Sequence, residues 1–264
     1  MNKLTAPYEH IKSIVKNERY AGKTLDLEFI RTMGFYILKN AVSKEKISNY
    51  YSEYKKSENL HVKNGHITNM TFDKVSPLNL IAFEPEILNL AKHFFNGNVG
   101  YLYPQIFRKD AENNKSVFLH NDICYMTGWF ERYSFFIALT DCHKNNGGIA
   151  IYPGTHNFGL LGDAGELNAE LVDNYPNVQA AMAPGDILIM HSATWHCSHE
   201  NIDLTDRVYL EIKIQDANDP TTKHVLCGER TSLWHFDLTN DELFKNSRSQ
   251  RLKQFYDLKN KIGA

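Results

Sequence analysis

Hydrophobic and polar positions in the first third of the chain alternate mainly with helical spacing. Residues 25–33 predict a short amphipathic helix that ends at Gly34, because glycine is favoured just past a helix C-terminus. A strand is expected directly after it, over residues 35–38. Ser43 is a suitable N-cap for a second helix that extends to about residue 57.

The pattern changes in the middle of the chain to short runs of β-branched and aromatic residues between Gly, Pro and Asn turns. Runs of this kind predict a β-sandwich or barrel. Helices are expected on both sides, over residues 86–95 and 238–262, so the sequence predicts an α+β fold in which the sheets carry the site. The expected strands cover residues 99–108, 116–120, 133–139, 149–152, 186–191 and 207–215.

Composition limits the class of protein. The 264 residues are 42% hydrophobic and 12% aromatic, enough to bury a core and to form a single domain over residues 1–264. A net charge of −2 gives no electrostatic reason to expect nucleic acid or a membrane surface as a partner. The four cysteines lack C-x-x-C spacing, so neither a zinc site nor a disulfide framework is expected. Since the first residues show no apolar run of signal-peptide length, we expect a cytoplasmic protein.

Candidate chemistry is concentrated in His120-Asn121-Asp122 and in His196. Two imidazoles and one carboxylate are the ligand set of non-haem Fe(II) sites, which leave further positions open for reactants. Side chains at i and i+2 of a strand point the same way, so His120 and Asp122 can reach one metal ion. His191 and His199 lie near His196 in the sequence and are the alternatives for the distal ligand.

The triplet is followed by a fixed order of motifs. An Asn-Gly turn and Pro-Gly-Thr-His lie within residues 146–156, Gly-Asp at 185–186, and Trp-His-x-Ser-x-x-Asn at 195–201, before Arg207. This succession, from about residue 119 to 214, resembles the phytanoyl-CoA dioxygenase-like family of Fe(II)/2-oxoglutarate oxygenases. The resemblance implies a double-stranded β-helix, a jelly-roll core over about residues 99–215, flanked by N- and C-terminal helices.

The same resemblance assigns roles to the candidate residues. It selects His196 as the third metal ligand beside His120 and Asp122, because Ser198 and Asn201 follow it as in the family and Arg207 lies 11 positions later. It implies three cofactors: Fe(II), the cosubstrate 2-oxoglutarate, and O2. Arg207 would pair with the far carboxylate of 2-oxoglutarate. Further expected contacts of the cosubstrate are Ser198, Gln105, Asn121 and Phe136, and expected contacts of the substrate are Tyr125 and Trp129.

One feature of the last long strand has two explanations. Alternation places Tyr209, Glu211 and Lys213 on the face of Arg207, which is a polar set for a barrel interior. Either helices cover the opposite face and the interior is polar, or a β-bulge shifts the alternation. The sequence leaves both open.

The expected activity is hydroxylation of an unactivated C–H bond of a small-molecule metabolite, with release of succinate and CO2. Asp122 favours hydroxylation or a related oxidation over halogenation, because halogenating relatives have Ala or Gly there. The alternatives are a cupin-type metal oxygenase or isomerase that does not use 2-oxoglutarate, and a non-catalytic small-molecule-binding jelly roll. Neither the substrate nor the oligomeric state follows from the sequence.

Overall fold

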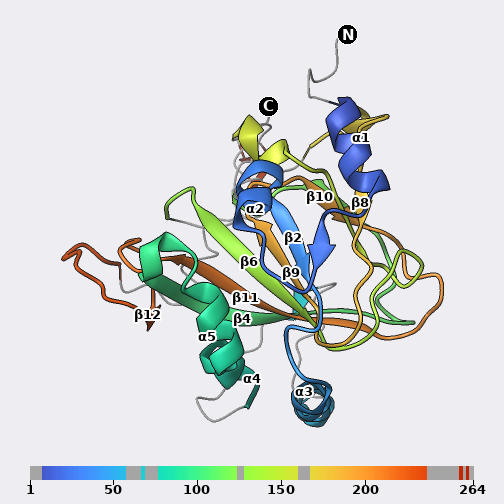
Figure 1. Cartoon of the computed structure of the whole chain (residues 1–264). Coiled ribbons are helices and arrows are strands. Elements are labelled where there is room, and N and C mark those ends of the chain that lie inside the picture. The colour runs from blue at the N-terminus through green and yellow to red at the C-terminus, as the bar shows by residue number, and fades with distance from the viewer. Residues whose placement is uncertain are drawn as a thin grey trace.

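The structure is a computed structural model that describes residues 8–57, 67–68, 77–123, 128–159, 167–236, 256–257 and 260–261. Two β-sheets lie face to face, and helices cover the outer face of the larger sheet (Figure 1). This is the expected double-stranded β-helix. Within the described residues, no helix combines the length and apolar character needed to cross a bilayer.

The larger sheet has eight strands. All its pairings are antiparallel except the short parallel contact between the first two strands. Its order is β1 (Ala21–Gly22), β2 (Phe35–Leu38), β9 (Ile187–His191), β6 (Arg132–Ala138), β11 (Arg207–Asp216), β4 (Val99–Lys109) and β12 (His224–Cys227), and β3 (Ile67–Thr68) also pairs with β4.

The smaller sheet has four antiparallel strands, in the order β5 (Val117–His120), β10 (His196–Ser198), β7 (Ile149–Ile151) and β8 (Val178–Gln179). The space between the sheets is filled by apolar side chains of both, among them Phe136 and Leu188 of the larger sheet and Ile151 and Val178 of the smaller one. This core fixes the distance between the sheets and therefore the geometry of whatever lies between them.

The N-terminal helices are α1 (Tyr8–Lys16), α2 (Leu27–Met33) and α3 (Lys44–Ser57). Asp26 caps α2 by accepting a 2.9 Å hydrogen bond from the Phe29 backbone, which satisfies one of the free N–H groups of the first turn. Gly34 ends α2 with φ +82°, and its N–H donates to Ile30 O. The expected helix end at Gly34 is confirmed.

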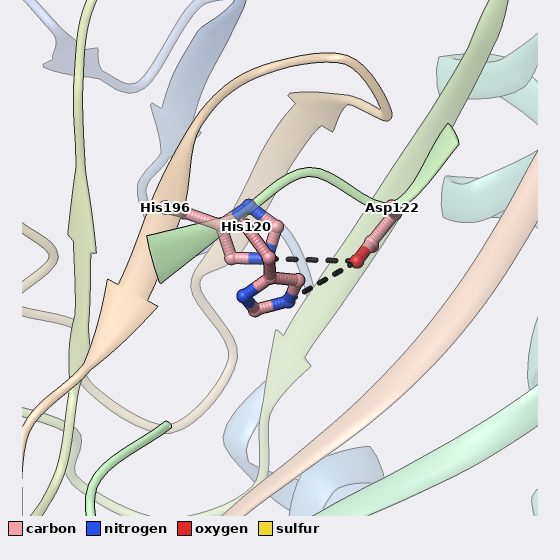
Figure 2. A group of neighbouring side chains, drawn as sticks. All are labelled: His120, Asp122 and His196. Carbon is pink, nitrogen blue, oxygen red and sulfur yellow. Dashed lines mark ion pairs between the residues drawn. The ribbon is translucent and has the colours of Figure 1, made fainter. Parts of the chain in front are cut away.

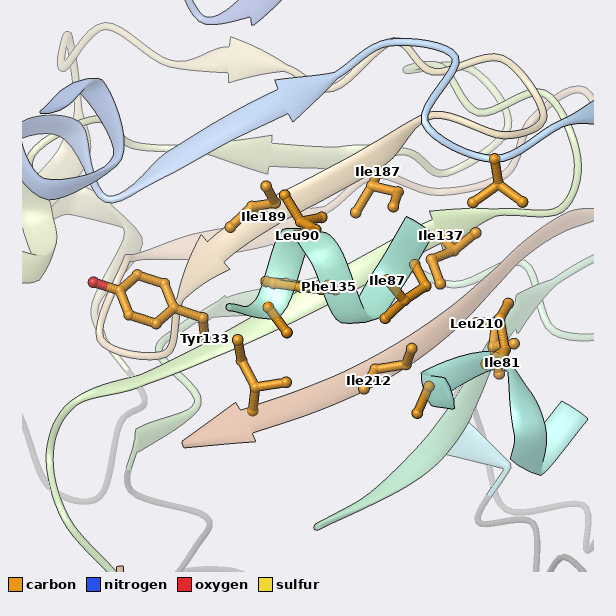
Figure 3. Packing of buried hydrophobic residues seen from close by; sticks show 14 of the residues in the cluster. Ile81, Ile87, Leu90, Tyr133, Phe135, Ile137, Ile187, Ile189, Leu210 and Ile212 are labelled. Atoms are coloured by element: carbon orange, nitrogen blue, oxygen red, sulfur yellow. The ribbon is translucent and has the colours of Figure 1, made fainter. Parts of the chain in front are cut away.

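A second group of helices packs on the outer face of the larger sheet: α4 (Pro77–Leu80), the 3-10 helix Ile81–Phe83 and α5 (Pro85–Ala91). Ile87 and Leu90 of α5 lie against Phe135 of β6 and Ile212 of β11 in one buried cluster (Figure 3). The helix expected over residues 86–95 ends early, at Ala91. The chain becomes extended at Phe94 (φ −105°, ψ 156°), and Phe95 and Asn96 then adopt positive φ angles of 51° and 54°, which a right-handed helix does not allow.

The register of β11 decides between the two explanations of its polar face. Val208, Leu210, Ile212 and Ile214 belong to the cluster under the helices. The opposite row, from Arg207 to Gln215, therefore faces the interior between the sheets. The irregularity opposite residues 212–214 occurs in the pairing with β4 and leaves the pairing with β6 regular, so the first explanation is correct.

The six strands expected in the middle of the chain are all present, with no end shifted by more than one residue, and the strand expected over residues 35–38 is present as β2. The short elements α1, β8, β10 and β12 were not expected. Of the helix expected over residues 238–262, only 256–257 and 260–261 are described, as helix, and the rest lies outside the described residues.

Candidate metal centre between the two sheets

Three side chains meet at the edge of the smaller sheet. His120 ends β5 and stands directly opposite His196 of β10 in the antiparallel register. Asp122 follows just after β5, held by a 2.8 Å hydrogen bond from its backbone N–H to Ser192 O. One donor atom from each of the three lies within 4.8 Å of the others. Figure 2 shows both imidazoles directed toward the Asp122 carboxylate.

Backbone contacts fix which nitrogen of each imidazole is free. His120 Nδ1 lies 2.8 Å from Phe118 O, and His196 Nδ1 lies 2.9 Å from Thr194 O. A carbonyl oxygen can only accept, so both Nδ1 atoms carry the hydrogen, and Nε2 is the nitrogen that has a lone pair in the neutral ring. The Nε2 atoms lie 3.5 Å and 3.7 Å from Asp122 Oδ1. Hydrogen bonds from Nδ1 to a backbone carbonyl, like these two, are the usual way in which metal-binding histidines are oriented.

The protonation of the cluster suits a divalent cation. Burial lowers the pKa of His196 to about 4, so this imidazole is neutral near pH 7. Burial alone would raise the pKa of Asp122, but Lys213 and the two histidines hold it well below its usual range. A neutral imidazole and an ionised carboxylate are the forms that bind metal.

A buried charged pair lies beside the cluster on β11. Lys213 Nζ is 3.0 Å from Asp122 Oδ2 and 3.2 Å from Glu211 Oε1. Burial lowers the pKa of Lys213, but the two carboxylates raise it more. For Glu211, burial raises the pKa more than Lys213 lowers it. Neither residue was singled out as a site residue, although strand alternation places both on the face of Arg207.

Arg207 begins the interior row of β11 and is 3% exposed. Its guanidinium lies over the Tyr209 ring at 4.6 Å, and Nη1 donates to Phe107 O at 3.4 Å. Lys109 of β4 is its register partner and is also buried. No carboxylate of the described residues forms an ion pair with Arg207, so this end of the interior carries uncompensated positive charge.

The remaining expected residues occupy different places. Gln105 of β4 and Phe136 of β6 flank Glu211 on the interior face of the larger sheet. Ser198 shares β10 with His196, and Asn121 is fully buried between the first two candidate ligands. Trp129 is 48% exposed, with its backbone N–H bonded to Asp219. Tyr125 lies outside the described residues.

The two alternative histidines point elsewhere. His191 Nε2 lies 3.3 Å from Glu131 Oε2, and His199 Nε2 lies 2.7 Å from Gln179 Oε1. Among the described residues, only His120, Asp122 and His196 form a group that could hold a metal ion. The structure therefore brings His196 to this candidate group, and it places His191 and His199 elsewhere.

Several buried polar atoms in this region have no hydrogen-bond partner within the described residues. They include Ser198 Oγ, Arg207 Nε and both side-chain polar atoms of Asn121. Buried polar groups are normally satisfied, so these atoms indicate that a polar ligand belongs between the sheets. A buried guanidinium without an ion-pair partner among the described residues suits a carboxylate, and the His-Asp-His group suits a divalent metal.

A family model for phytanoyl-CoA dioxygenase (PhyH) matches residues 30–207. This segment includes the candidate ligands and Arg207, and it covers more than half of the chain. The chain belongs to the phytanoyl-CoA dioxygenase family. The resemblance seen in the sequence motifs is thereby confirmed. No curated protein matches the sequence.

Solved structures of related fold come from non-haem iron enzymes. The epimerase SnoN in complex with Fe3+, alpha ketoglutarate and nogalamycin RO is 14% identical, with a TM-score of 0.65 over 89% of this chain and 97% of that one. The alpha ketoglutarate dependent carbocyclase SnoK is 17% identical, with a TM-score of 0.64 over 76% and 87% of the two chains. The non-heme monooxygenase ThoJ is 20% identical, with a TM-score of 0.62 over 87% and 93%.

At these identities the likeness shows the fold. Iron and 2-oxoglutarate, the metal and cosubstrate expected from the sequence of this phytanoyl-CoA dioxygenase family member, are those present in the SnoN structure. The reactions named for the three neighbours differ: epimerisation, carbocycle formation and monooxygenation. The fold therefore does not decide which oxidation this chain performs.

Proposed function

We propose that this protein is an Fe(II)- and 2-oxoglutarate-dependent dioxygenase that hydroxylates an unactivated C–H bond of a small-molecule metabolite. The observation that carries the proposal is the orientation of His120 and His196. Their Nε2 atoms face the same oxygen of Asp122 at 3.5 Å and 3.7 Å, while the other oxygen faces away toward Lys213. One metal ion can therefore be bound by one atom from each side chain.

Each candidate residue would have a defined role. His120, Asp122 and His196 would hold the iron, and Arg207 would pair with the far carboxylate of 2-oxoglutarate, with Ser198 donating its hydroxyl hydrogen beside it. Gln105, Asn121 and Phe136 would line the cosubstrate pocket, and Tyr125 and Trp129 the substrate pocket. When bound, iron and 2-oxoglutarate supply the oxidising chemistry, in which O2 is reduced, 2-oxoglutarate becomes succinate and CO2, and one oxygen atom enters the substrate.

Burial is the second contribution of the chain. The apolar core between the sheets and the buried residues of β11 keep bulk water from the region of Arg207. A carboxylate paired there is desolvated, so the charge pair fixes its orientation more firmly than it would at a surface. This lets the protein hold a small dicarboxylate in one pose.

The test is substrate-dependent turnover. Purified protein is supplied with Fe(II), 2-oxoglutarate, ascorbate and a panel of polar small metabolites, and succinate is measured together with the mass of each metabolite. A member of the panel that stimulates succinate formation and gains 16 mass units supports hydroxylation. Succinate formation with a product of another mass indicates a different oxidation, which contradicts the proposed hydroxylation.

A second measurement separates this proposal from its alternatives without a known substrate. Under anaerobic conditions, Fe(II) and 2-oxoglutarate together should give a weak visible charge-transfer absorption. A metal enzyme that does not use 2-oxoglutarate, or a binding protein without a metal site, gives no such band. Loss of the band in Asp122→Ala, with the band retained when the exposed Asp203 is replaced by Ala, would attribute it to this site.

A further inference from the structure

The two oxygens of Asp122 have different neighbours. Oδ1 faces the two imidazole Nε2 atoms at 3.5 Å and 3.7 Å. Oδ2 accepts a hydrogen bond of 3.0 Å from Lys213 Nζ. The ammonium group therefore takes one oxygen of the carboxylate and leaves only the other directed at the point where the candidate ligands converge.

Lys213 is firmly placed for this contact. Its side chain is 6% exposed, and it extends from the interior row of β11. Strand β11 is buried on both faces and is hydrogen-bonded on both sides, to β4 and to β6. The strand pairing fixes the backbone of Lys213, and burial together with the contacts to Asp122 and Glu211 holds its ammonium group in place.

A cation so close to a metal ligand carries an electrostatic cost, since it repels a divalent ion bound to the same carboxylate. Glu211 offsets this repulsion, because its Oε1 lies 3.2 Å from the same Nζ and it is 0% exposed. Asp122, Lys213 and Glu211 thus form a buried row of alternating charge. Within the described residues, Lys213 is the cation that forms an ion pair with Glu211.

We propose that Lys213 is a positioning residue that restricts Asp122 to metal binding through Oδ1, and that Glu211 supplies the counter-charge that makes this arrangement stable. The inference rests on the proposed function, because it assumes that His120, Asp122 and His196 bind the metal. A carboxylate that chelates through both oxygens takes one more coordination position. That position is among those that the facial triad leaves open for reactants, so Lys213 keeps it available.

The experiment uses Co(II) in place of Fe(II), because Co(II) binds the same nitrogen and oxygen ligands and its visible absorption reports the coordination number. The decisive variant is Lys213→Met/Glu211→Gln, which removes both charges of the Lys213–Glu211 pair and leaves the Asp122 carboxylate without its ammonium partner. We expect it to bind Co(II) with an altered absorption spectrum. We also expect its Kd for 2-oxoglutarate, measured by calorimetry on the Co(II)-loaded protein, to rise on the order of tenfold, the lower end of the loss in metal affinity or activity that follows removal of an outer partner of a metal ligand.

Two further variants serve as controls. Lys213→Arg keeps a cation that can donate to Oδ2, so it should retain the wild-type spectrum. Lys39→Met removes another lysine–aspartate pair, the 2.9 Å contact with Asp186, and should leave both the spectrum and the Kd unchanged. If the double variant does not fold, the single Lys213→Met variant gives the same comparison, because Glu211 can bind a proton once the ammonium is gone.

Two outcomes would overturn the inference. One is a wild-type spectrum and an unchanged 2-oxoglutarate Kd in the variants that lack Lys213. The other is a Lys213→Arg protein that resembles the double variant. Two other results would contradict the proposed function itself: the wild-type protein binds no Co(II), or the Asp122→Ala variant binds Co(II) as tightly as the wild type. Failure of the inference and failure of the proposed function are therefore distinguishable.

Discussion

His120 and His196 stand opposite each other on neighbouring antiparallel strands, and their ring centroids are 4.2 Å apart. They are 76 positions apart in the sequence, so the pairing of β5 with β10 brings the two candidate ligands together. A shift of one residue in this register would turn one imidazole to the other face of the sheet. The integrity of the site therefore depends on the register of a three-residue strand.

Removal of the Asp122 carboxylate should abolish substrate-dependent succinate formation. The Asp122→Ala protein keeps both imidazoles but loses the anionic ligand, and two neutral nitrogens hold a ferrous ion weakly. Succinate measured with and without substrate checks this. Asp203→Ala, which removes an exposed carboxylate, should retain wild-type turnover. Full activity in Asp122→Ala would show that this side chain is not a ligand.

Replacement of Arg207 should weaken binding of 2-oxoglutarate. Loss of one member of a desolvated charge pair typically costs about 2–5 kcal/mol, which corresponds to an increase of more than about tenfold in the apparent KM for 2-oxoglutarate. Arg207→Ala is compared with Arg31→Ala, which removes an exposed arginine of α2. An unchanged KM in Arg207→Ala would contradict the assignment, as would an equal increase in both variants.

Lys109 should make the ligand-free protein more stable as the pH rises above neutrality. Burial and the neighbouring Arg207 lower the pKa of Lys109 to about 7, whereas an unfolded chain has a lysine pKa near 10.4. Between these values the unfolded state binds more protons than the folded state, so the free energy of unfolding increases with pH. From pH 7 to 9 this contribution is on the order of 2 kcal/mol.

Urea unfolding at the two pH values, in wild-type protein and in Lys109→Met, measures this contribution. The pH-dependent gain should be smaller in the variant by the amount that Lys109 supplies. Equal gains in the two proteins would mean that Lys109 keeps its charge in the folded state up to pH 9, which contradicts the lowered pKa.

Truncation of Ile212 should destabilise the fold. This side chain is 0% exposed in the layer between β11 and the helices, and Ile→Ala at such a position costs about 2–5 kcal/mol. Ile202 is 64% exposed, so Ile202→Ala should change the free energy of unfolding by no more than about 0.5 kcal/mol. Urea midpoints of the two variants test the comparison, and equal losses would contradict the packing described for this layer.

Most of the fold followed from local patterns in the sequence. The strands of the core and the end of α2 at Gly34 are set by alternation and by backbone preference, which act within a few residues. Very short strands such as β8 and β10 carry too few residues to show alternation. Beyond α5 the chain is extended at Phe94 and left-handed at Phe95 and Asn96, conformations that residue type alone does not predict at a phenylalanine.

The candidate site was only partly predictable from the sequence. The three candidate ligands and Arg207 could be selected because a family motif fixes their order. Lys213 and Glu211 could be placed on the interior face by alternation, but the contact with Asp122 depends on how the two sheets pack. Lys109 gave no signal, since its position opposite Arg207 results from the pairing of β4 with β11.

The hydrogen bond between Lys213 and Asp122 joins β11 of the larger sheet to the segment that follows β5 of the smaller one. In the proposed site, coordination of the metal would thereby be coupled to the distance between the two sheets. Heating that lets the two layers separate slightly, while each keeps its own strand pairing, will release the carboxylate from its fixed orientation. Catalytic competence will accordingly disappear at a lower temperature than secondary structure does.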